Sequence, residues 1–215
     1  GVFQLAQPLT IRPEAHYRLG DYKKAVQRLE EAVELEAGDW VIQNVANSAV
    51  GRLLIVLAKQ RGLRTVNVVR RADLVIVDGD DLAARVAAVT GSAAIKLGVE
   101  AIGGAATGRI VDSVATDATV VHYGSMSGED PRVGRSNFVY RGVKLTGFML
   151  GRFLARRSPE KIRAIYADLA AQVMAGTLSA PVDTVYPIEK IKEALAHADK
   201  GGRNGKILVA PNGAI

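Results

Sequence analysis

The stretch from Trp40 to Val69 most constrains what this chain can fold into. It opens with an apolar run of strand length, Trp40–Val45. Small and polar residues follow as far as Gly51, and then a mostly apolar run of helical length, which Gly62 can end. Thr65–Val69 is rich in β-branched residues, as buried parallel strands are. This order predicts half of a βαβ unit and an α/β fold with a doubly wound, mostly parallel sheet and helices on both faces.

The turn of this unit keeps one of the three glycines that a dinucleotide-binding turn usually carries. Aligned on the last glycine of a G-x-G-x-x-G pattern, the three positions are Ala46, Ser48 and Gly51. Gly51 allows close packing of helix on strand, and Ala46 fits a tight turn if its φ stays negative. A serine hydroxyl can still contact phosphate, and a helix N-terminus attracts anions. The pattern alone fits a strand–turn–helix without a ligand as well.

Two arginines follow the second strand. Arg70 and Arg71 stand 19 and 20 residues after Gly51, where an NAD-binding unit has an acid for the ribose 2′-hydroxyl. Guanidinium groups at that point suit a 2′-phosphate through charge-assisted hydrogen bonds. The pair therefore favours NADP(H) over NAD, although two solvated arginines at a strand end remain the alternative.

Composition limits the partners. The 215 residues carry a net charge of +6, which fits surplus surface Lys and Arg and also fits an anionic ligand such as a phosphorylated cofactor or a CoA thioester. No basic stripe with interleaved aromatics indicates a nucleic acid. No apolar run reaches the length of about 18–20 residues that a membrane span needs, and no secretory leader opens the sequence. We therefore expect no nucleic-acid or membrane partner and a cytoplasmic protein, or a mitochondrial-matrix protein in a eukaryote.

Metal-binding patterns are missing from the sequence. Cysteine is absent, so thiolate zinc sites are excluded. The histidines His16, His122 and His197 show no ligand spacing, and no metal is predicted. His122 falls in a predicted buried strand, and we interpret it as a hydrogen-bonded core residue.

Several stretches, taken together, resemble the medium-chain dehydrogenase/reductase superfamily, and most closely its zinc-independent 2-enoyl thioester reductase branch (mitochondrial-type trans-2-enoyl-CoA/ACP reductases). In chain order they are "GDWVIQNVANSAVG", "GLRTVNVVRR", "VVHYGSMSG", "VKLTGFML", the long stretch from Ser158 to Ala198, and "GRNGKILV". The resemblance covers about residues 25–213. It implies a Rossmann-type NADP-binding domain at residues 25–215, with residues 1–24 as a separate strand/helix segment.

The resemblance also implies a cofactor path for NADP(H). The pyrophosphate would lie over the turn after the first strand, and the nicotinamide end would lie between two later loops, with one lysine nearby as a cation. With the two arginines, the expected cofactor-binding residues are Asn47, Ser48, Ala49, Val50, Gly51, Arg70, Arg71, Tyr123, Gly124, Ser125, Met126, Phe148, Met149, Leu150 and Lys206.

The activity implied by the resemblance is hydride transfer from NADPH to the activated C=C bond of an acyl thioester linked to CoA or to an acyl carrier protein. The tyrosine that the family uses lies in a catalytic domain with no counterpart here, so no catalytic residue is assigned and this chain alone could be inactive. A non-catalytic NADP(H)-binding or interaction module and a quinone-reductase-like enzyme remain alternatives. The family also implies a homodimer joined through the edge strand Val143 to Leu150, unless residues 1–20 cover that edge.

Two features depart from the family. Only four residues, "RRAD", separate the strand-like runs Val66–Val69 and Leu74–Val77, whereas parallel neighbours need a crossover of about a dozen or more. Either the two runs pair differently, or residues are missing from this sequence. In addition, Leu9–Glu30 aligns without gaps on Leu178–Asp199, and both read as strand, turn and amphipathic helix. The front of the chain is either a copy of a family tail or a chance match.

Overall fold

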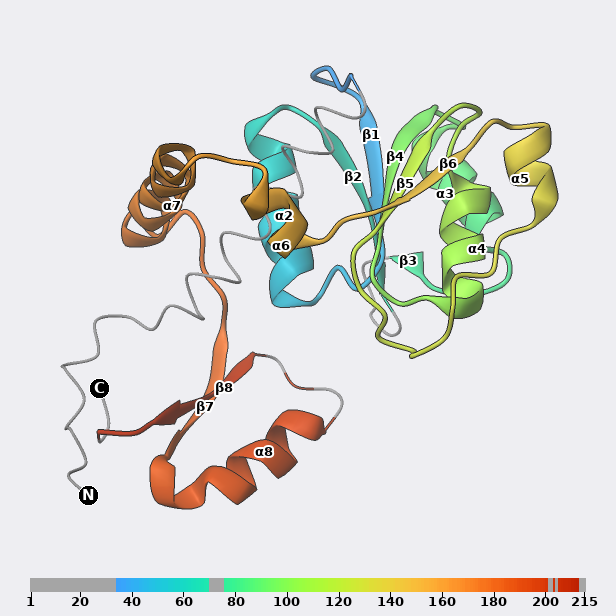
Figure 1. Cartoon of the computed structure of the whole chain (residues 1–215). Coiled ribbons are helices and arrows are strands. Elements are labelled where there is room, and N and C mark those ends of the chain that lie inside the picture. The colour runs from blue at the N-terminus through green and yellow to red at the C-terminus, as the bar shows by residue number, and fades with distance from the viewer. Residues whose placement is uncertain (1–33, 70–75, 201–202, 204, 213–215) are drawn as a thin grey trace.

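Six parallel strands form the main sheet of the protein. The computed structural model describes residues 34–69, 76–200, 203 and 205–212 (Figure 1). The strand order is β3-β2-β1-β4-β5-β6, and every neighbouring pair is parallel. The strands are β1 Trp40–Gln43, β2 Arg64–Val69, β3 Ile76–Val77, β4 Ile95–Glu100, β5 Thr119–His122 and β6 Lys144–Gly147. The predicted doubly wound parallel sheet is confirmed.

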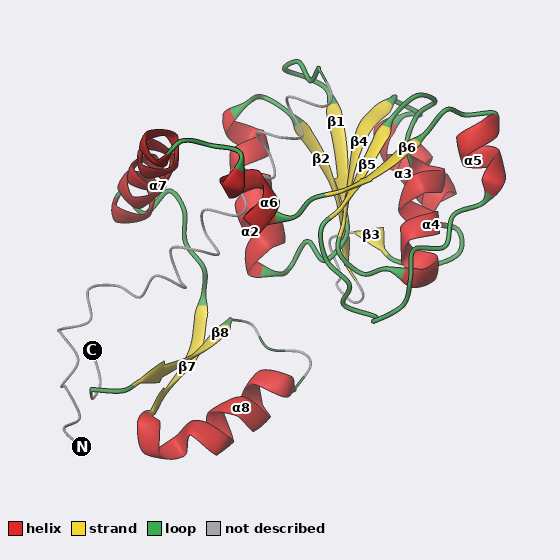
Figure 2. Cartoon of the chain, viewed as in Figure 1, coloured by secondary structure: helices red, strands yellow, loops and turns green. Residues whose placement is uncertain are grey.

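Helices cover both faces of this sheet (Figure 2). The helices in this part of the chain are α2 Ala49–Gln60, α3 Leu82–Thr90, α4 Gly104–Ser113, α5 Arg135–Val139, α6 Leu150–Ala155 and α7 Pro159–Met174. On one face, Val86 of α3 and Ile110 of α4 pack with Ile42 and Val120 of the strands. On the other face, residues of α2 and α7 pack with the opposite sides of the same strands, namely Leu53, Leu54, Leu57 and Leu169 with Val41, Leu97, Val99 and Val121. The central strands are thus buried on both faces, which explains their continuous apolar sequences.

A small unit lies at the C-terminal end of the described chain. It consists of β7 Val182–Pro187, a 3-10 turn at Ile188–Lys190, α8 Ile191–Asp199 and β8 Lys206–Ala210. β7 and β8 pair in parallel with each other and form a two-stranded sheet of their own. The predicted NADP-binding domain, residues 25–215, includes these two strands, which in the described residues pair with each other rather than with the six-stranded sheet. The strand–turn–helix expected for residues 178–199 is present, whereas its proposed copy at residues 9–30 lies outside the described residues.

The two strand-like runs around residue 72 pair in parallel. Val68 of β2 lies opposite Ile76 of β3, and Val69 lies opposite Val77. This is the arrangement of a regular Rossmann unit, so the alternative that the runs pair differently does not hold. Residues 70–75 between them lie outside the described part of the chain.

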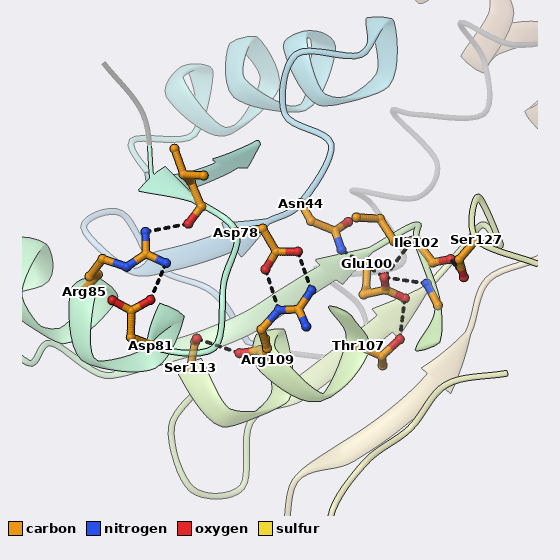
Figure 3. Close-up of polar contacts among 12 residues, drawn as sticks. Asn44, Asp78, Asp81, Arg85, Glu100, Ile102, Thr107, Arg109, Ser113 and Ser127 are labelled. Atoms are coloured by element: carbon orange, nitrogen blue, oxygen red, sulfur yellow. Dashed lines mark hydrogen bonds and ion pairs between the residues drawn. The ribbon is translucent and has the colours of Figure 1, made fainter. Parts of the chain in front are cut away.

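The end of β3 is fixed to α4 by a bidentate ion pair, in which Arg109 Nε and Nη2 donate to the carboxylate of Asp78 at 2.7 and 2.6 Å (Figure 3).

The start of α2 packs closely against the end of β1. A Cβ atom added to Gly51 would lie 2.5 Å from the Cα of Ala46 and 2.7 Å from the carbonyl oxygens of Ala46 and Val45. All three atoms belong to the backbone, which cannot move aside as a side chain can. The side chain of Gln43 strengthens this junction, because its Nε2 donates to the Gly51 carbonyl oxygen at 3.0 Å and to Asn67 Oδ1 on β2 at 2.8 Å.

We predict that Gly51→Ala lowers the free energy of unfolding by about 1–3 kcal/mol, because the new methyl group overpacks the β1–α2 junction. Urea unfolding followed by circular dichroism measures the change. The matched control is Gly151→Ala in α6, where the nearest atom to the added Cβ is Met149 Cε at 3.9 Å. That change should be neutral or stabilise the protein by up to about 1 kcal/mol. Equal effects of the two substitutions would contradict this account of Gly51.

Candidate functional site

The structure brings three of the predicted cofactor segments to one edge of the sheet. Residues 47–51 follow β1, residues 123–126 follow β5, and residues 148–150 follow β6. Because all six strands are parallel, their carboxyl ends meet at the same edge, which is where open α/β sheets bind ligands. Backbone hydrogen bonds extend the ladder there, from Tyr123 N–H to the Glu100 carbonyl and from Phe148 N–H to the His122 carbonyl, both at 2.9 Å.

The turn between β1 and α2 has the geometry of an anion-binding turn. Ser48 is the N-cap of α2, and its Oγ accepts a hydrogen bond from Gly51 N–H at 3.0 Å. The acceptor side of the hydroxyl is therefore engaged, while its proton can still be donated. The first turn of α2 holds no acidic residue that would repel an anion. The strained residue of the turn is Val45, with a φ of 54°, whereas Ala46 avoids positive φ as the alignment required.

Arg52 is a candidate residue that the sequence analysis missed. It follows Gly51 directly, and its Nε donates to the carbonyl oxygen of Asn47 at 3.2 Å. The guanidinium group thus lies against the turn that we expect to hold the pyrophosphate. The sequence signal for this candidate was a cationic residue placed immediately after the last glycine of the turn.

Glu100 is the centre of a buried polar network behind this edge. The residue is fully buried, at 0% exposure, at the end of β4. Its Oε1 accepts from Asn44 Nδ2 at 2.9 Å and from the backbone N–H groups of Ile102 and Gly103 at 2.6 and 2.9 Å (Figure 3). Its Oε2 accepts from Thr107 Oγ1 at 3.0 Å and contacts His122 Nδ1. One carboxylate therefore joins the ends of β1, β4 and β5 to the start of α4.

The hydrogen bonds decide the ionisation state of Glu100. Burial raises the pKa of its carboxyl group, whereas hydrogen bonds from Asn44, Gly103 N–H, His122 and Ile102 N–H lower that pKa, so it lies below the ordinary value of 4.5. The carboxylate is thus ionised at neutral pH and acts only as an acceptor.

His122 differs from a fully buried core histidine. As predicted, it lies on a strand and its ring is hydrogen-bonded, through Nδ1 to Glu100. Its side chain, however, is 22% exposed, because the residue is the last of β5 and reaches the carboxyl edge.

The remaining predicted residues fall elsewhere. Lys206 is the first residue of β8 and so belongs to the two-stranded sheet rather than to the six-stranded sheet whose edge holds the three segments. Its role as a cation near the nicotinamide stays a prediction, and the sequence did not reveal that β8 pairs with β7. Arg70 and Arg71 lie outside the described residues.

Within residues 34–69, 76–200, 203 and 205–212, no three His, Cys, Asp or Glu side chains gather in a way that could hold a metal ion. In the same part of the chain, no helix is long and apolar enough to cross a membrane.

We predict that Glu100→Gln lowers the free energy of unfolding at neutral pH by about 2–3 kcal/mol, because an amide cannot accept hydrogen bonds from all the donors around it. Since the pKa of Glu100 is depressed in the folded protein, its stabilising contribution is present above the ordinary value of 4.5 and is lost as the pH falls through the folded-state pKa. The stability difference between wild type and variant should therefore shrink in acid.

Urea unfolding between about pH 3 and about pH 7 tests this expectation. The matched control is Glu160→Gln, which removes an exposed carboxylate at the start of α7 that pairs with Arg163 and should change the stability little. A difference between wild type and Glu100→Gln that stays constant across this pH range would rule out the ionised carboxylate as the source of the stability.

Curated relatives with similar sequences are mitochondrial enoyl-[acyl-carrier-protein] reductases. The human protein is 27% identical over an alignment of 213 residues, and the match covers 89% of this chain and 53% of the relative. The Arabidopsis thaliana protein is 29% identical over an alignment of 202 residues, and the match covers 86% of this chain and 54% of the relative. This chain therefore spans about half the length of the curated relatives that it matches.

Solved structures share the fold. A Bacillus thuringiensis protein assigned as an NADPH:quinone reductase matches with a TM-score of 0.75 and 19% identity, over 89% of this chain and 62% of that one. The mitochondrial 2-enoyl thioester reductase Etr1p/Etr2p heterodimer from Candida tropicalis matches with a TM-score of 0.73 and 17% identity, over 89% and 60%. The Etr1p/NADP/crotonyl-CoA complex matches with a TM-score of 0.70 and 18% identity, over 93% and 65%.

A family match settles the membership. Residues 70–209 match the family described as zinc-binding dehydrogenase, and this range is more than half of the 215 residues. The same range includes the ends of β4, β5 and β6, which build most of the candidate site. The protein therefore belongs to the zinc-binding dehydrogenase family of the medium-chain dehydrogenase/reductase superfamily.

Proposed function

We propose that the protein is an NADPH-dependent oxidoreductase that reduces the activated C=C bond of a 2-enoyl thioester, and that this chain supplies its cofactor-binding part. The observation that carries the proposal is the meeting of the three segments after β1, β5 and β6 at the carboxyl edge of one parallel sheet. NADPH, when bound, supplies the hydride for the β-carbon of the enoyl group. The contribution of the chain is to bind and orient that cofactor.

The proposed cofactor path starts at the β1–α2 turn. Backbone N–H groups at the start of α2 and the Ser48 hydroxyl would hold the pyrophosphate, with Arg52 as an added cation. The close approach at Gly51 supports this role, because it sets the N-terminus of α2 directly against the end of β1. Residues 123–126 and 148–150 would line the nicotinamide end, and Arg70 and Arg71 would hold the 2′-phosphate.

The substrate class is proposed from the relatives. The curated relatives are named as enoyl-acyl-carrier-protein reductases of mitochondria, and Etr1p was solved with NADP and crotonyl-CoA. We extend this to an acyl thioester carried by CoA or by an acyl carrier protein, and to the mitochondrial matrix if the source is a eukaryote, or otherwise the cytoplasm.

A second candidate function follows from the length of the chain. Because it spans about half of its curated relatives, the chain could bind NADP(H) without catalysing a reaction alone. The similarity to the Bacillus thuringiensis protein adds a quinone as an alternative electron acceptor.

Binding and turnover separate these candidates. NADPH binding is measured by the change in its fluorescence, and turnover by NADPH oxidation with crotonyl-CoA or with a quinone. Binding together with crotonyl-CoA reduction supports the proposed function. Binding without turnover favours the non-catalytic module, turnover with the quinone alone favours that alternative, and absence of NADPH binding rejects all three.

We predict that Arg70→Ala/Arg71→Ala weakens NADPH binding by about 2–4 kcal/mol, because each arginine would lose charge-assisted hydrogen bonds to the 2′-phosphate and the two losses are not fully additive. NADH binding should hardly change, since NADH lacks that phosphate. Parallel titrations with the two cofactors measure the effect. Arg203→Ala, which removes an exposed arginine bonded to the Lys200 carbonyl, is the control. Equal losses for NADPH and NADH would remove the arginines from the proposed 2′-phosphate site.

We further propose a homodimer joined through the edge strand. β6 is the last strand of the six-stranded sheet, so one side of its backbone is unpaired in the described structure. The preceding segment adds exposed apolar area, with Phe138, Val139 and Tyr140 at 44%, 69% and 78% exposure. An isologous antiparallel pairing of two such edges would bury both. The alternative cover, residues 1–20, lies outside the described residues.

Alternation along β6 identifies the residue to change. Lys144 N–H and Phe148 N–H both donate to residues of the neighbouring β5 segment, so the N–H of Gly147 points to the open side. We predict that Gly147→Pro converts the dimer to a monomer, because proline removes this outward donor. Light scattering at micromolar concentration should give about twice 22.8 kDa for wild type and about 22.8 kDa for the variant. Gly147→Ala keeps the donor and should remain dimeric. A wild-type mass of one chain would contradict the proposed dimer.

A further inference from the structure

The imidazole of His122 has one nitrogen that the buried network does not use. Nδ1 contacts the carboxylate of Glu100. Nε2 makes no hydrogen bond to any described residue. In the same residues, the buried side-chain atoms without a hydrogen-bond partner are Gln43 Oε1 and Arg85 Nε, and His122 Nε2 is not one of them. The side chain is 22% exposed, while Glu100 on its other side is fully buried. Nε2 is therefore open to solvent, with a fixed carboxylate behind the ring.

Glu100 also fixes which nitrogen carries the proton. A carboxylate only accepts, so Nδ1 must be the donor in this contact. In the neutral ring, Nε2 is then a hydrogen-bond acceptor with a set direction. The carboxylate is itself held by four other donors on Asn44, Ile102, Gly103 and Thr107, so it cannot turn away from the ring.

The position of this acceptor is at the middle of the candidate site. His122 ends β5, with Glu100 of β4 and Gly147 of β6 as its neighbours in register. Its side chain shares a sheet face with Val120, because side chains two apart on a strand point the same way. The next residue is Tyr123, the first of the segment proposed to line the nicotinamide end.

We propose that His122 is a cofactor-contacting residue whose Nε2 accepts a hydrogen bond from the carboxamide group of the nicotinamide ring. This inference rests on the proposed function. The pyrophosphate offers no proton at neutral pH, and its proposed place is at the β1–α2 turn. On the nicotinamide ring, the carboxamide NH2 is the group that can donate. Glu100 acts through His122 as a positioning residue, since it fixes the tautomer and the direction of Nε2.

Imidazole ¹⁵N NMR of the labelled protein tests the contact directly. NADP⁺ should shift the Nε2 signal of His122, whereas 2′,5′-ADP, which has the adenosine and the 2′-phosphate but no nicotinamide, should leave it in place. His197 is the internal control, because its Nδ1 is 2.9 Å from the Tyr186 hydroxyl in the two-stranded unit. Glu100→Gln should change the ¹⁵N pattern of His122 from one tautomer toward a mixture, a readout that loss of stability alone would not produce.

His122→Asn is the matched variant. The asparagine amide can replace Nδ1 as a donor to Glu100 but carries nothing at the place of Nε2. Affinity for NADP⁺ should fall about threefold to tenfold, the effect of one hydrogen bond, while affinity for 2′,5′-ADP stays unchanged. His197→Asn should alter neither affinity.

The outcomes are distinct. If both ligands bind and NADP⁺ leaves the His122 signal unmoved, or if His122→Asn weakens both ligands equally, this inference is overturned while the proposed cofactor function stands. If neither ligand binds wild-type protein, the proposed function fails and the inference fails with it.

Discussion

The Glu100 carboxylate is the interaction on which the carboxyl edge of this protein depends. Taking a carboxylate out of water costs several kcal/mol unless it is well paired. Here five donors surround it, and they come from the end of β1, from the loop and first turns of α4, and from the end of β5. The strand ends cannot move independently while they share this acceptor. The positions of the loops that follow β1 and β5 are thereby fixed from within the sheet.

The β1–α2 turn depends on a different constraint, which is close backbone packing. Val45 takes a positive φ that β-branched residues rarely adopt, and the close contact between Gly51 and Ala46 leaves the chain no room to relax. Asn44 connects the two constraints. Its Nδ2 donates to Glu100, and its Oδ1 accepts from Ala101 N–H at 3.0 Å. This turn has one glycine instead of three, and its conformation is set by close packing and by hydrogen bonds to neighbouring residues.

Much of the fold could be predicted from the sequence because the signals are local. The runs Trp40–Val45 and Thr65–Val69 predict strands from six and five consecutive residues, and β1 and β2 lie there. Networks that join distant residues were not predictable in this way. Asn44 and Glu100 are 56 positions apart, and no local pattern links the two residues. Lys206 was assigned to the site by resemblance alone, and no local pattern indicated that its strand β8 pairs with β7 in a second sheet.

The six-stranded sheet and the small C-terminal unit differ in how much of their apolar surface is buried. The described segments proposed to bind the cofactor follow strands β1, β5 and β6 of the six-stranded sheet, and buried contacts hold these strand ends in place. In the described residues, the small unit leaves Val182, Leu195 and Leu208 at 50%, 62% and 42% exposure. A two-stranded sheet is marginal alone in water, so this unit gains more than the main sheet does from any surface that covers it. The proposed cofactor site therefore lies in the part of the described chain whose shape is held by its own buried contacts.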